Sequence, residues 1–167
     1  MRASGGTNIF IRYLIDEEVQ VNWSSWFTDL ATPQRRKAMV ETFGRDCHGF
    51  ALWPALDVQP EDLIVDKTRF GAFVPGSSKL HEILQERGID TLIITGTATN
   101  VCCESTARDA MQMNYKIIFV ADGNAALTDA EHNATLTNMV TLFADVMATE
   151  EVTGFLDRAA ALKQAAE

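Results

Sequence analysis

The sequence has few cysteines, and their arrangement does not suit a disulfide-stabilised fold. Its 167 residues contain three cysteines, an odd number, and two of them, Cys102 and Cys103, are adjacent. Disulfide frameworks of secreted proteins use an even number of spaced cysteines, whereas proteins of reducing compartments keep their thiols free. The cysteine pattern therefore argues against a disulfide scaffold and predicts a cytoplasmic protein.

Basic residues are also scarce relative to acidic ones. The chain has 14 lysines and arginines against 23 aspartates and glutamates, which gives a formal net charge of −9 at pH 7. A protein that binds nucleic acid or an anionic membrane needs a basic excess to neutralise phosphate groups. The charge balance therefore argues against nucleic acid and against a membrane as partners.

No apolar run is long enough to cross a bilayer. The first one, residues 8–15, is short and is interrupted by Arg12, and no basic segment followed by a long apolar stretch marks a signal peptide. Internal repeats are absent, and the only biased stretch is the alanine-rich end at residues 159–166. Because 47% apolar and 22% charged residues are ordinary for a globular protein, we expect one domain over residues 1–167.

The chain does contain short apolar segments that alternate with helical patterns. The predicted strands lie at residues 8–14, 61–66, 90–95, 116–121 and 145–149. The predicted helices lie at residues 32–43, 77–86, 102–113, 128–143 and from residue 150 onwards. Because strands that alternate with helices form right-handed crossovers, we expect a three-layer α-β-α domain with a mostly parallel, doubly wound sheet.

Several local expectations accompany this architecture. Residues 16–25 are polar and acidic and predict a loop, whose Trp23 and Trp26 either wall a pocket or, as we favour, pack the loop onto the core. The β-branched run at residues 91–95 predicts a strand that is buried on both faces. In the predicted helices at residues 102–113 and 128–143, the residues expected to face inward are Ala107, Ala110, Met111, Met113, Met139, Val140 and Phe143.

The most informative stretch is residues 91–122, TLIITGTATNVCCESTARDAMQMNYKIIFVAD, which predicts a strand, a sharp turn, a helix and a strand. Gly96 ends the first strand, and Cys102 follows at or near the first turn of the helix. Free backbone N–H groups and the positive end of the helix dipole converge there and stabilise a thiolate. Cys102 is therefore a candidate nucleophile, although a lone cysteine in a helix is more often a small buried side chain.

Lys67 occupies a comparable position after another strand. It follows the apolar segment at residues 61–66, and the carboxyl ends of parallel strands meet at one edge of a sheet. An ammonium beside a thiol favours the thiolate and stabilises an anion that develops on a substrate. A lysine at a strand end is by itself usually solvated, so it is the pairing with Cys102 that makes Lys67 a candidate.

Three segments carry a resemblance to a known family: DKTRFGAF, GTATNVCCESTARDA and NYKIIFVADGNAAL. They closely resemble the isochorismatase-like cysteine hydrolases, in particular the branch of N-carbamoylsarcosine, ureidoacrylate and biuret amidohydrolases, and the resemblance covers residues 8–152. It implies a hydrolase that cleaves a C–N bond of a small amide, ureido or carbamoyl compound through a thioester intermediate. It also implies that no cofactor is needed and that the protein is a homo-oligomer.

The resemblance assigns roles to individual residues. Cys102 is the implied nucleophile and Lys67 the supporting cation. A cis peptide joins Thr97 and Ala98, and the N–H groups of Ala98 and Cys102 form an oxyanion hole. Phe70 lines the substrate pocket, as does Thr97.

Two arginines are further candidates for substrate binding. Arg69 and Arg12 each carry a guanidinium that can bind a substrate carboxylate, although an exposed arginine is more often simply solvated.

The chain departs from the family pattern at its start. Family members begin with a strand that ends in an aspartate, in a pattern like V-I-D-M-Q, and this aspartate is the proton shuttle of an Asp-Lys-Cys triad. This sequence has no such segment, and Asp16 and Glu17 follow the wrong strand to replace it. We therefore expect a domain that is truncated at its N-terminus relative to the family. The missing strand then either belongs to the natural protein and is lacking from this sequence, or is supplied by another chain.

Other functions stay open at this point. A catalytically impaired family member acting as a binding or oligomerising domain is one alternative, and thiol redox sensing through Cys102 and Cys103 is another, although adjacent cysteines close a strained ring. A zinc site built with His48 lacks ligand spacing, and His48, His81 and His132 are too scattered for the metal site of a nicotinamidase. Because of this spacing, we expect no metal. Isochorismate hydrolysis is disfavoured because family members with that activity typically lack the nucleophilic cysteine.

Overall fold

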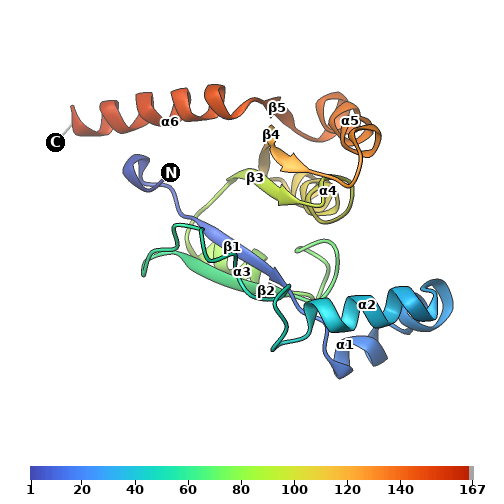
Figure 1. Ribbon diagram of the computed structural model, residues 1–167. Coiled ribbons are helices and arrows are strands. Elements are labelled where there is room, and N and C mark those ends of the chain that lie inside the picture. Colours follow the sequence, from blue (N-terminus) through green and yellow to red (C-terminus); the bar gives the residue numbers. More distant parts are fainter. Residues whose placement is uncertain (166–167) are drawn as a thin grey trace.

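The computed structural model describes residues 1–165, in which five parallel strands form two sheets with helices between the strands (Figure 1). The strands are β1 (Ile9–Tyr13), β2 (Leu63–Lys67), β3 (Thr91–Thr97), β4 (Lys116–Ala125) and β5 (Asp145–Met147). The α-helices are α1 (Glu17–Asn22), α2 (Pro33–Phe43), α3 (Leu80–Glu86), α4 (Glu104–Gln112), α5 (Asp129–Asn138) and α6 (Thr149–Gln164). Shorter helical turns lie at Arg2–Ser4, Ser25–Leu30, Thr99–Cys103 and Met139–Phe143.

The strands confirm the predicted α/β class but not a single sheet. β1 pairs with β2, and β3, β4 and β5 form the second sheet in that order, with every pair parallel. β1 and β3 each have one neighbouring strand, so within residues 1–165 each also has an edge to which no strand is hydrogen-bonded. Figure 1 shows the two sheets apart, with α1 and α2 beyond the carboxyl end of β1.

The open edge of β3 explains why one prediction about this strand is wrong. The run at residues 91–95 was expected to be buried on both faces, yet Leu92, Ile93 and Ile94 are only half-buried and Thr95 is exposed. A strand in the middle of a sheet is covered by neighbours along both edges. Because β4 is the only strand paired with β3 within residues 1–165, solvent reaches the side chains of β3.

The main hydrophobic core lies between the two sheets and the helices α3 and α4. Ala107 and Ala110 are fully buried in it, as predicted from their helical spacing. Met113 is 39% exposed, contrary to the prediction, because α4 ends at Gln112 and Met113 lies beyond its last turn. Asn114 then turns the chain with a φ of 72°, a left-handed conformation that asparagine tolerates.

Predicted helix ends agree well with the structure. The Thr32 hydroxyl accepts the Arg35 N–H at 3.2 Å at the start of α2, and Thr128 and Glu131 form the capping box of α5. Gly88 follows α3 with a φ of 64°. Val140 was predicted to face inward but is 63% exposed, because the chain continues from α5 as a wider π-helical turn that changes which residues share a face.

Residues 16–25 are helical rather than a loop. Asp16 caps α1 by accepting the Val19 N–H at 2.9 Å, and a π-helical turn follows at Ser25–Leu30. The buried members of a second core cluster are Ile15, Val19, Trp26, Phe27 and Ala31. Trp26 therefore packs onto the core as favoured, but it does so from a helical segment. The helical form of this segment was not predicted because its composition is polar and only a few apolar side chains pack it against the core.

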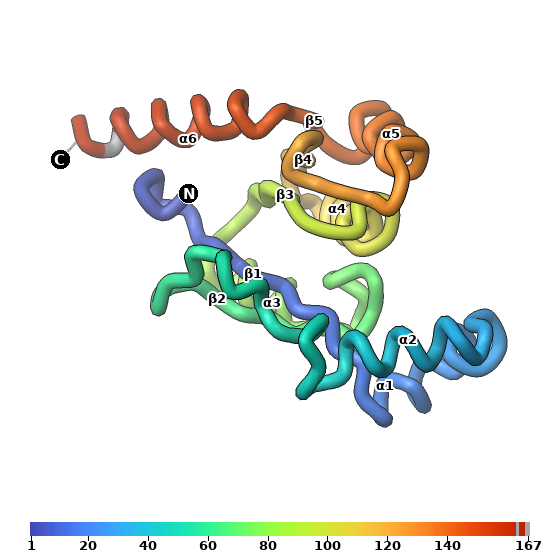
Figure 2. The backbone as a smooth tube through the Cα atoms, in the orientation of Figure 1, coloured from blue at the N-terminus to red at the C-terminus, as the bar shows by residue number. Residues whose placement is uncertain are grey.

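The two ends of the described chain lie side by side. The Ser4 hydroxyl donates to the Leu156 carbonyl of α6 at 2.8 Å, and Figure 2 shows the N-terminal turn next to this helix. Across residues 1–165, no helix combines the length and the apolarity that crossing a membrane would require.

Glu104 connects α4 to α5 through its carboxylate. It accepts hydrogen bonds from the Thr135 hydroxyl at 2.6 Å, from the Arg108 guanidinium at 2.6 Å and from the Asn138 amide at 3.3 Å. Burial of Glu104 disfavours its charge, but the bonds from Thr135 and Arg108 outweigh that effect and lower the pKa of Glu104 below its ordinary value.

We expect Glu104→Ala to lower the free energy of unfolding at pH 7 by about 1–3 kcal/mol, because the buried Thr135 hydroxyl loses its acceptor. The lowered pKa means that this stabilisation is present above the ordinary pKa of 4.5 and is lost as pH falls through the lower folded value. Urea unfolding of the wild type and the variant at several pH values should therefore show a difference that shrinks towards low pH. Exposed Glu86→Ala is the control, with an expected change within about 0.5 kcal/mol. A loss that is independent of pH would contradict a carboxylate acceptor.

Candidate active site

The ammonium of Lys67 lies among three acceptors at the end of β2. Nζ donates to the carbonyl oxygens of Arg69 at 2.8 Å and Phe70 at 2.7 Å, and it lies 3.2 Å from Sγ of Cys102. Because a lysine ammonium has three N–H donors, all of them are used here. Lys67 is 4% exposed, so this cation is not a solvated surface charge. The structure thus brings together the two side chains that the sequence singled out.

The protonation of Lys67 reflects two opposed effects. Burial lowers the pKa of Lys67 below its ordinary value, whereas the adjacent Cys102 sulfur favours the charged ammonium. The buried ammonium thus lies 3.2 Å from the sulfur, where it can pair with an anion that forms at the site.

The adjacent cysteines differ in environment. Cys102 is half-buried and faces Lys67, whereas Cys103 is 6% exposed and belongs to the main core. Burial raises the pKa of the Cys103 thiol to about 12, and the neighbouring Cys102 adds to this effect. Cys103 is therefore a protonated thiol at neutral pH. Both cysteines are free, with no disulfide between them.

A sharp turn carries Cys102 from β3 into α4. The peptide bond between Thr97 and Ala98 is cis, as the resemblance implies, and Gly96 has a φ of 132°. The Ala98 carbonyl accepts the N–H groups of Val101 at 3.1 Å and Cys103 at 3.2 Å. The Ala98 N–H donates in none of the turn and cap hydrogen bonds found within residues 1–165.

The buried base of this turn is fixed by a contact with α5. Thr99 is fully buried, and its hydroxyl lies 2.9 Å from Nδ1 of His132. This hydrogen bond connects the turn to a helix that is distant in the sequence. His132 is thereby a structural neighbour of the site, and His81 bonds instead to Tyr115 at 2.9 Å.

Four aromatic side chains form what we call the aromatic wall: Tyr13, Trp23, Trp26 and Phe70. The Phe70 ring centroid lies 4.9 Å from that of Trp23, 5.9 Å from that of Tyr13 and 6.1 Å from that of Trp26. The Tyr13 ring lies 4.6 Å from Nζ of Lys67, which places the wall beside the cysteine–lysine pair. Sequence reasoning missed Tyr13, although its position at the end of a predicted strand is the signal that identified Lys67.

The two candidate arginines have different positions. The Arg69 guanidinium stacks on Trp23 at 4.9 Å from the ring centroid, so it lies at the rim of the aromatic wall. Arg12 pairs with Asp66 at 2.7 Å and stacks on Phe50 at 4.3 Å. Because side chains alternate along a strand, Arg12 points to the opposite face of β1 from Tyr13. The suggestion that Arg12 binds a substrate carboxylate stays a prediction.

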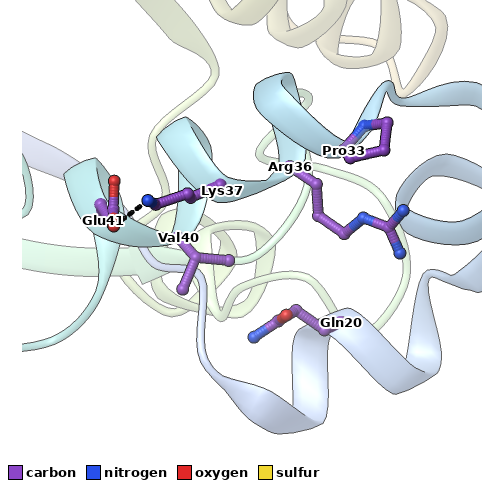
Figure 3. Close-up of a pocket in the computed structure, with 6 residues that line it drawn as sticks. All are labelled: Gln20, Pro33, Arg36, Lys37, Val40 and Glu41. Carbon is purple, nitrogen blue, oxygen red and sulfur yellow. Dashed lines mark ion pairs between the residues drawn. The ribbon is translucent and has the colours of Figure 1, made fainter.

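A separate hollow of about 350 Å³ lies between α1 and α2 (Figure 3). The residues that line it are Gln20, Pro33, Arg36, Lys37, Val40 and Glu41. Lys37 and Glu41 form an ion pair across one turn of α2, with 3.7 Å between Nζ and Oε1. No residue of this hollow belongs to the cysteine–lysine pair or to the aromatic wall, so we assign the hollow no part in the site.

The described residues thus form an α/β protein with parallel strands, flanking helices and a cysteine–lysine pair at a strand-to-helix turn. The Isochorismatase domain matches residues 1–151, so the chain belongs to the isochorismatase family. The predicted family is thereby confirmed.

Known relatives agree with this assignment. Ureidoacrylate amidohydrolase RutB of Methylobacterium radiotolerans is 36% identical over 129 residues, which cover 75% of this chain and 49% of that protein. An isochorismatase family protein of Burkholderia thailandensis has a TM-score of 0.77 and 30% identity, covering 93% of this chain and 76% of that one. A cysteine hydrolase of Pseudomonas syringae pv. phaseolicola has a TM-score of 0.76 and 27% identity, covering 95% and 75%. The chain spans about half the length of the curated relatives that it matches first.

Proposed function

We propose that this protein hydrolyses a C–N bond of a small amide, ureido or carbamoyl compound, with Cys102 as the nucleophile. The observation that carries the proposal is the distance of 3.2 Å between Nζ of the buried Lys67 and Sγ of Cys102. Similarity to a ureidoacrylate amidohydrolase supports the substrate class. The free thiols suit a cytoplasmic enzyme, and we expect a homo-oligomer, which light scattering of the purified protein would test.

The proposed reaction is an acyl transfer in two stages. The Cys102 thiolate attacks the carbonyl carbon, and the N–H groups of Ala98 and Cys102 donate to the oxyanion. The C–N bond then breaks, the amine leaves with a proton from an acid, and the acyl group stays on sulfur as a thioester. Water hydrolyses this thioester and restores the thiolate. Phe70 and Thr97 line the pocket in this proposal, and Arg69 binds a substrate carboxylate at the rim.

We further propose that a strand from outside residues 1–167 lies between β1 and β3 and supplies the acid. The unpaired edges of β1 and β3 support this, since backbone groups at strand edges accept another strand. The span of the chain, about half that of its curated relatives, supports it as well. The domain is then truncated relative to the family.

The origin of that strand is open to direct test. The intact mass of the protein purified from its native cells should exceed the mass of residues 1–167 if the strand belongs to the same chain, and a second chain should co-purify if it does not. A natural product that begins at Met1 and is an active monomer would refute the proposal.

Ammonia release from a panel of ureido and carbamoyl amides tests the activity, with Cys102→Ala as control. The wild type should release ammonia from at least one compound much faster than the variant. Equally slow release from every compound by both proteins would refute the amidohydrolase proposal.

One observation favours a second candidate function, that of a binding or oligomerising domain with impaired catalysis. Within residues 1–165, the hydrogen bonds of Lys67 involve two carbonyls and a sulfur but no carboxylate, so the described site holds no paired acid. Iodoacetamide discriminates between the two functions. Stoichiometric labelling of Cys102 at neutral pH favours the enzyme, whereas an inert Cys102 favours the binding domain.

A further inference from the structure

The hydroxyl of Tyr13 is a buried polar group without a hydrogen-bond partner in residues 1–165. The chain has two tyrosines, and they differ in this respect. The Tyr115 hydroxyl bonds to Nδ1 of His81 at 2.9 Å. A buried hydroxyl that loses water without gaining a partner destabilises the fold, so an unpaired one calls for an explanation.

Tyr13 is held firmly at the proposed reaction centre. It is the last residue of β1 and lies opposite Lys67 in the parallel register, so both side chains project from the same face. Its ring lies 4.6 Å from Nζ of Lys67 and packs against Phe43 and Phe70, at centroid distances of 5.1 and 5.9 Å. These contacts restrain the ring of Tyr13.

The hydroxyl keeps its proton at neutral pH. Burial raises the pKa of Tyr13 well above its ordinary value, and the charge of the Cys102 sulfur raises it further, although Arg69 opposes both. A protonated phenol is a hydrogen-bond donor. Tyr13 is thus close enough to Cys102 to sense its charge, yet no hydrogen bond joins the two side chains within the described residues.

We propose that the Tyr13 hydroxyl is a substrate-binding group that donates a hydrogen bond to an oxygen of the amide or ureido group that Cys102 attacks. This inference rests on the proposed function and adds a named donor on β1 to the site. A ureido or amide oxygen is a strong acceptor, and a fixed donor beside the nucleophile orients it for attack. If the Tyr13 hydroxyl donates to the substrate, this explains both why it has no hydrogen-bond partner within residues 1–165 and why Tyr13 lies beside Lys67.

Tyr13→Phe tests the proposal because it removes only the hydroxyl and keeps the ring contacts with Phe43 and Phe70. We expect kcat/KM for the amides that the wild type hydrolyses to fall about tenfold, mainly through KM, as for loss of one hydrogen bond. The melting temperature should not fall, since no protein partner is lost. Tyr115→Phe is the matched control: it should lower the melting temperature by removing the bond to His81 and leave KM unchanged.

A second readout does not depend on turnover. N-carbamoylglycine, a small ureido acid, should protect Cys102 from alkylation by iodoacetamide, as followed by peptide mass spectrometry. The concentration that gives half-protection should rise about tenfold in Tyr13→Phe and stay unchanged in Tyr115→Phe.

The outcomes separate this inference from the proposed function. A Tyr13→Phe variant that binds and hydrolyses like the wild type overturns the role of Tyr13 and leaves the amidohydrolase proposal intact. A melting temperature that falls as much as in Tyr115→Phe shows that the hydroxyl has a protein partner, and this also overturns the role. A wild type that shows neither hydrolysis nor protection overturns both proposals.

Discussion

Replacing Cys102 with alanine is expected to lower kcat for amide hydrolysis by about ten-thousandfold or more, because the thioester can no longer form. The neighbouring thiol cannot take over. Cys103 is 6% exposed, and burial raises its pKa to about 12, so it is neither accessible nor ionised at neutral pH. Ammonia release measured at saturating substrate gives kcat directly.

Cys103→Ala is the matched control for this experiment. It changes the adjacent thiol and should keep most of the activity, at the price of a somewhat lower melting temperature because it leaves a small gap in the core. Hydrolysis by Cys102→Ala at a rate close to that of the wild type would show that the nucleophile lies elsewhere. Loss of activity in Cys103→Ala with normal stability would show that Cys102 has been wrongly assigned as the nucleophile.

Lys67→Met should be nearly as damaging. Methionine has a similar length and suits a buried position, but it removes the ammonium that lies 3.2 Å from the Cys102 sulfur. We expect kcat/KM to fall about 100- to 1,000-fold, as when a charge-stabilising donor is removed from an active site. We also expect the rate at which iodoacetamide alkylates Cys102 at neutral pH to fall about tenfold or more, because a thiolate without its counter-charge is less populated.

The pH dependence of alkylation separates an electrostatic role of Lys67 from a packing role. If the ammonium stabilises the thiolate, the alkylation rate of Lys67→Met should recover as pH rises and hydroxide deprotonates the thiol. Lys116→Met is the control, since Lys116 pairs with Asp90 at 2.7 Å on the surface and its loss should leave both rates unchanged. An unaltered alkylation rate at neutral pH in Lys67→Met would contradict the proposed pairing.

Local patterns in the sequence were sufficient for the five strands, for most of the helices and for two candidate site residues that the structure brings together. Thr32, Thr128 and Glu131 are recognisable because capping depends on residues three positions apart. Cys102 and Lys67 are recognisable because each closely follows a strand, and the ends of parallel strands meet.

The aromatic wall was harder to predict. Trp23 and Trp26 lie in a segment whose acidic composition suggests a loop, and its helical form depends on the cap by Asp16 and on contacts with a distant core. Tyr13 ends an apolar strand and carries no local sign that its hydroxyl is left unpaired. Arg12 directly precedes Tyr13 but points to the other face of β1. Position along the chain therefore did not show which of these two side chains lies beside Lys67.

The sequence by itself determined the alternation of strands and helices, most helix ends and the candidate cysteine, because these depend on the periodicity and chemistry of residues that are close in the chain. Only the tertiary structure decided that, within residues 1–165, the strands form two sheets with open edges at β1 and β3, and that the buried Tyr13 hydroxyl has no hydrogen-bond partner. It also decided that Lys67 reaches a sulfur 35 residues away. The physical reason is that such contacts arise from the packing of segments distant in sequence, which no local pattern encodes.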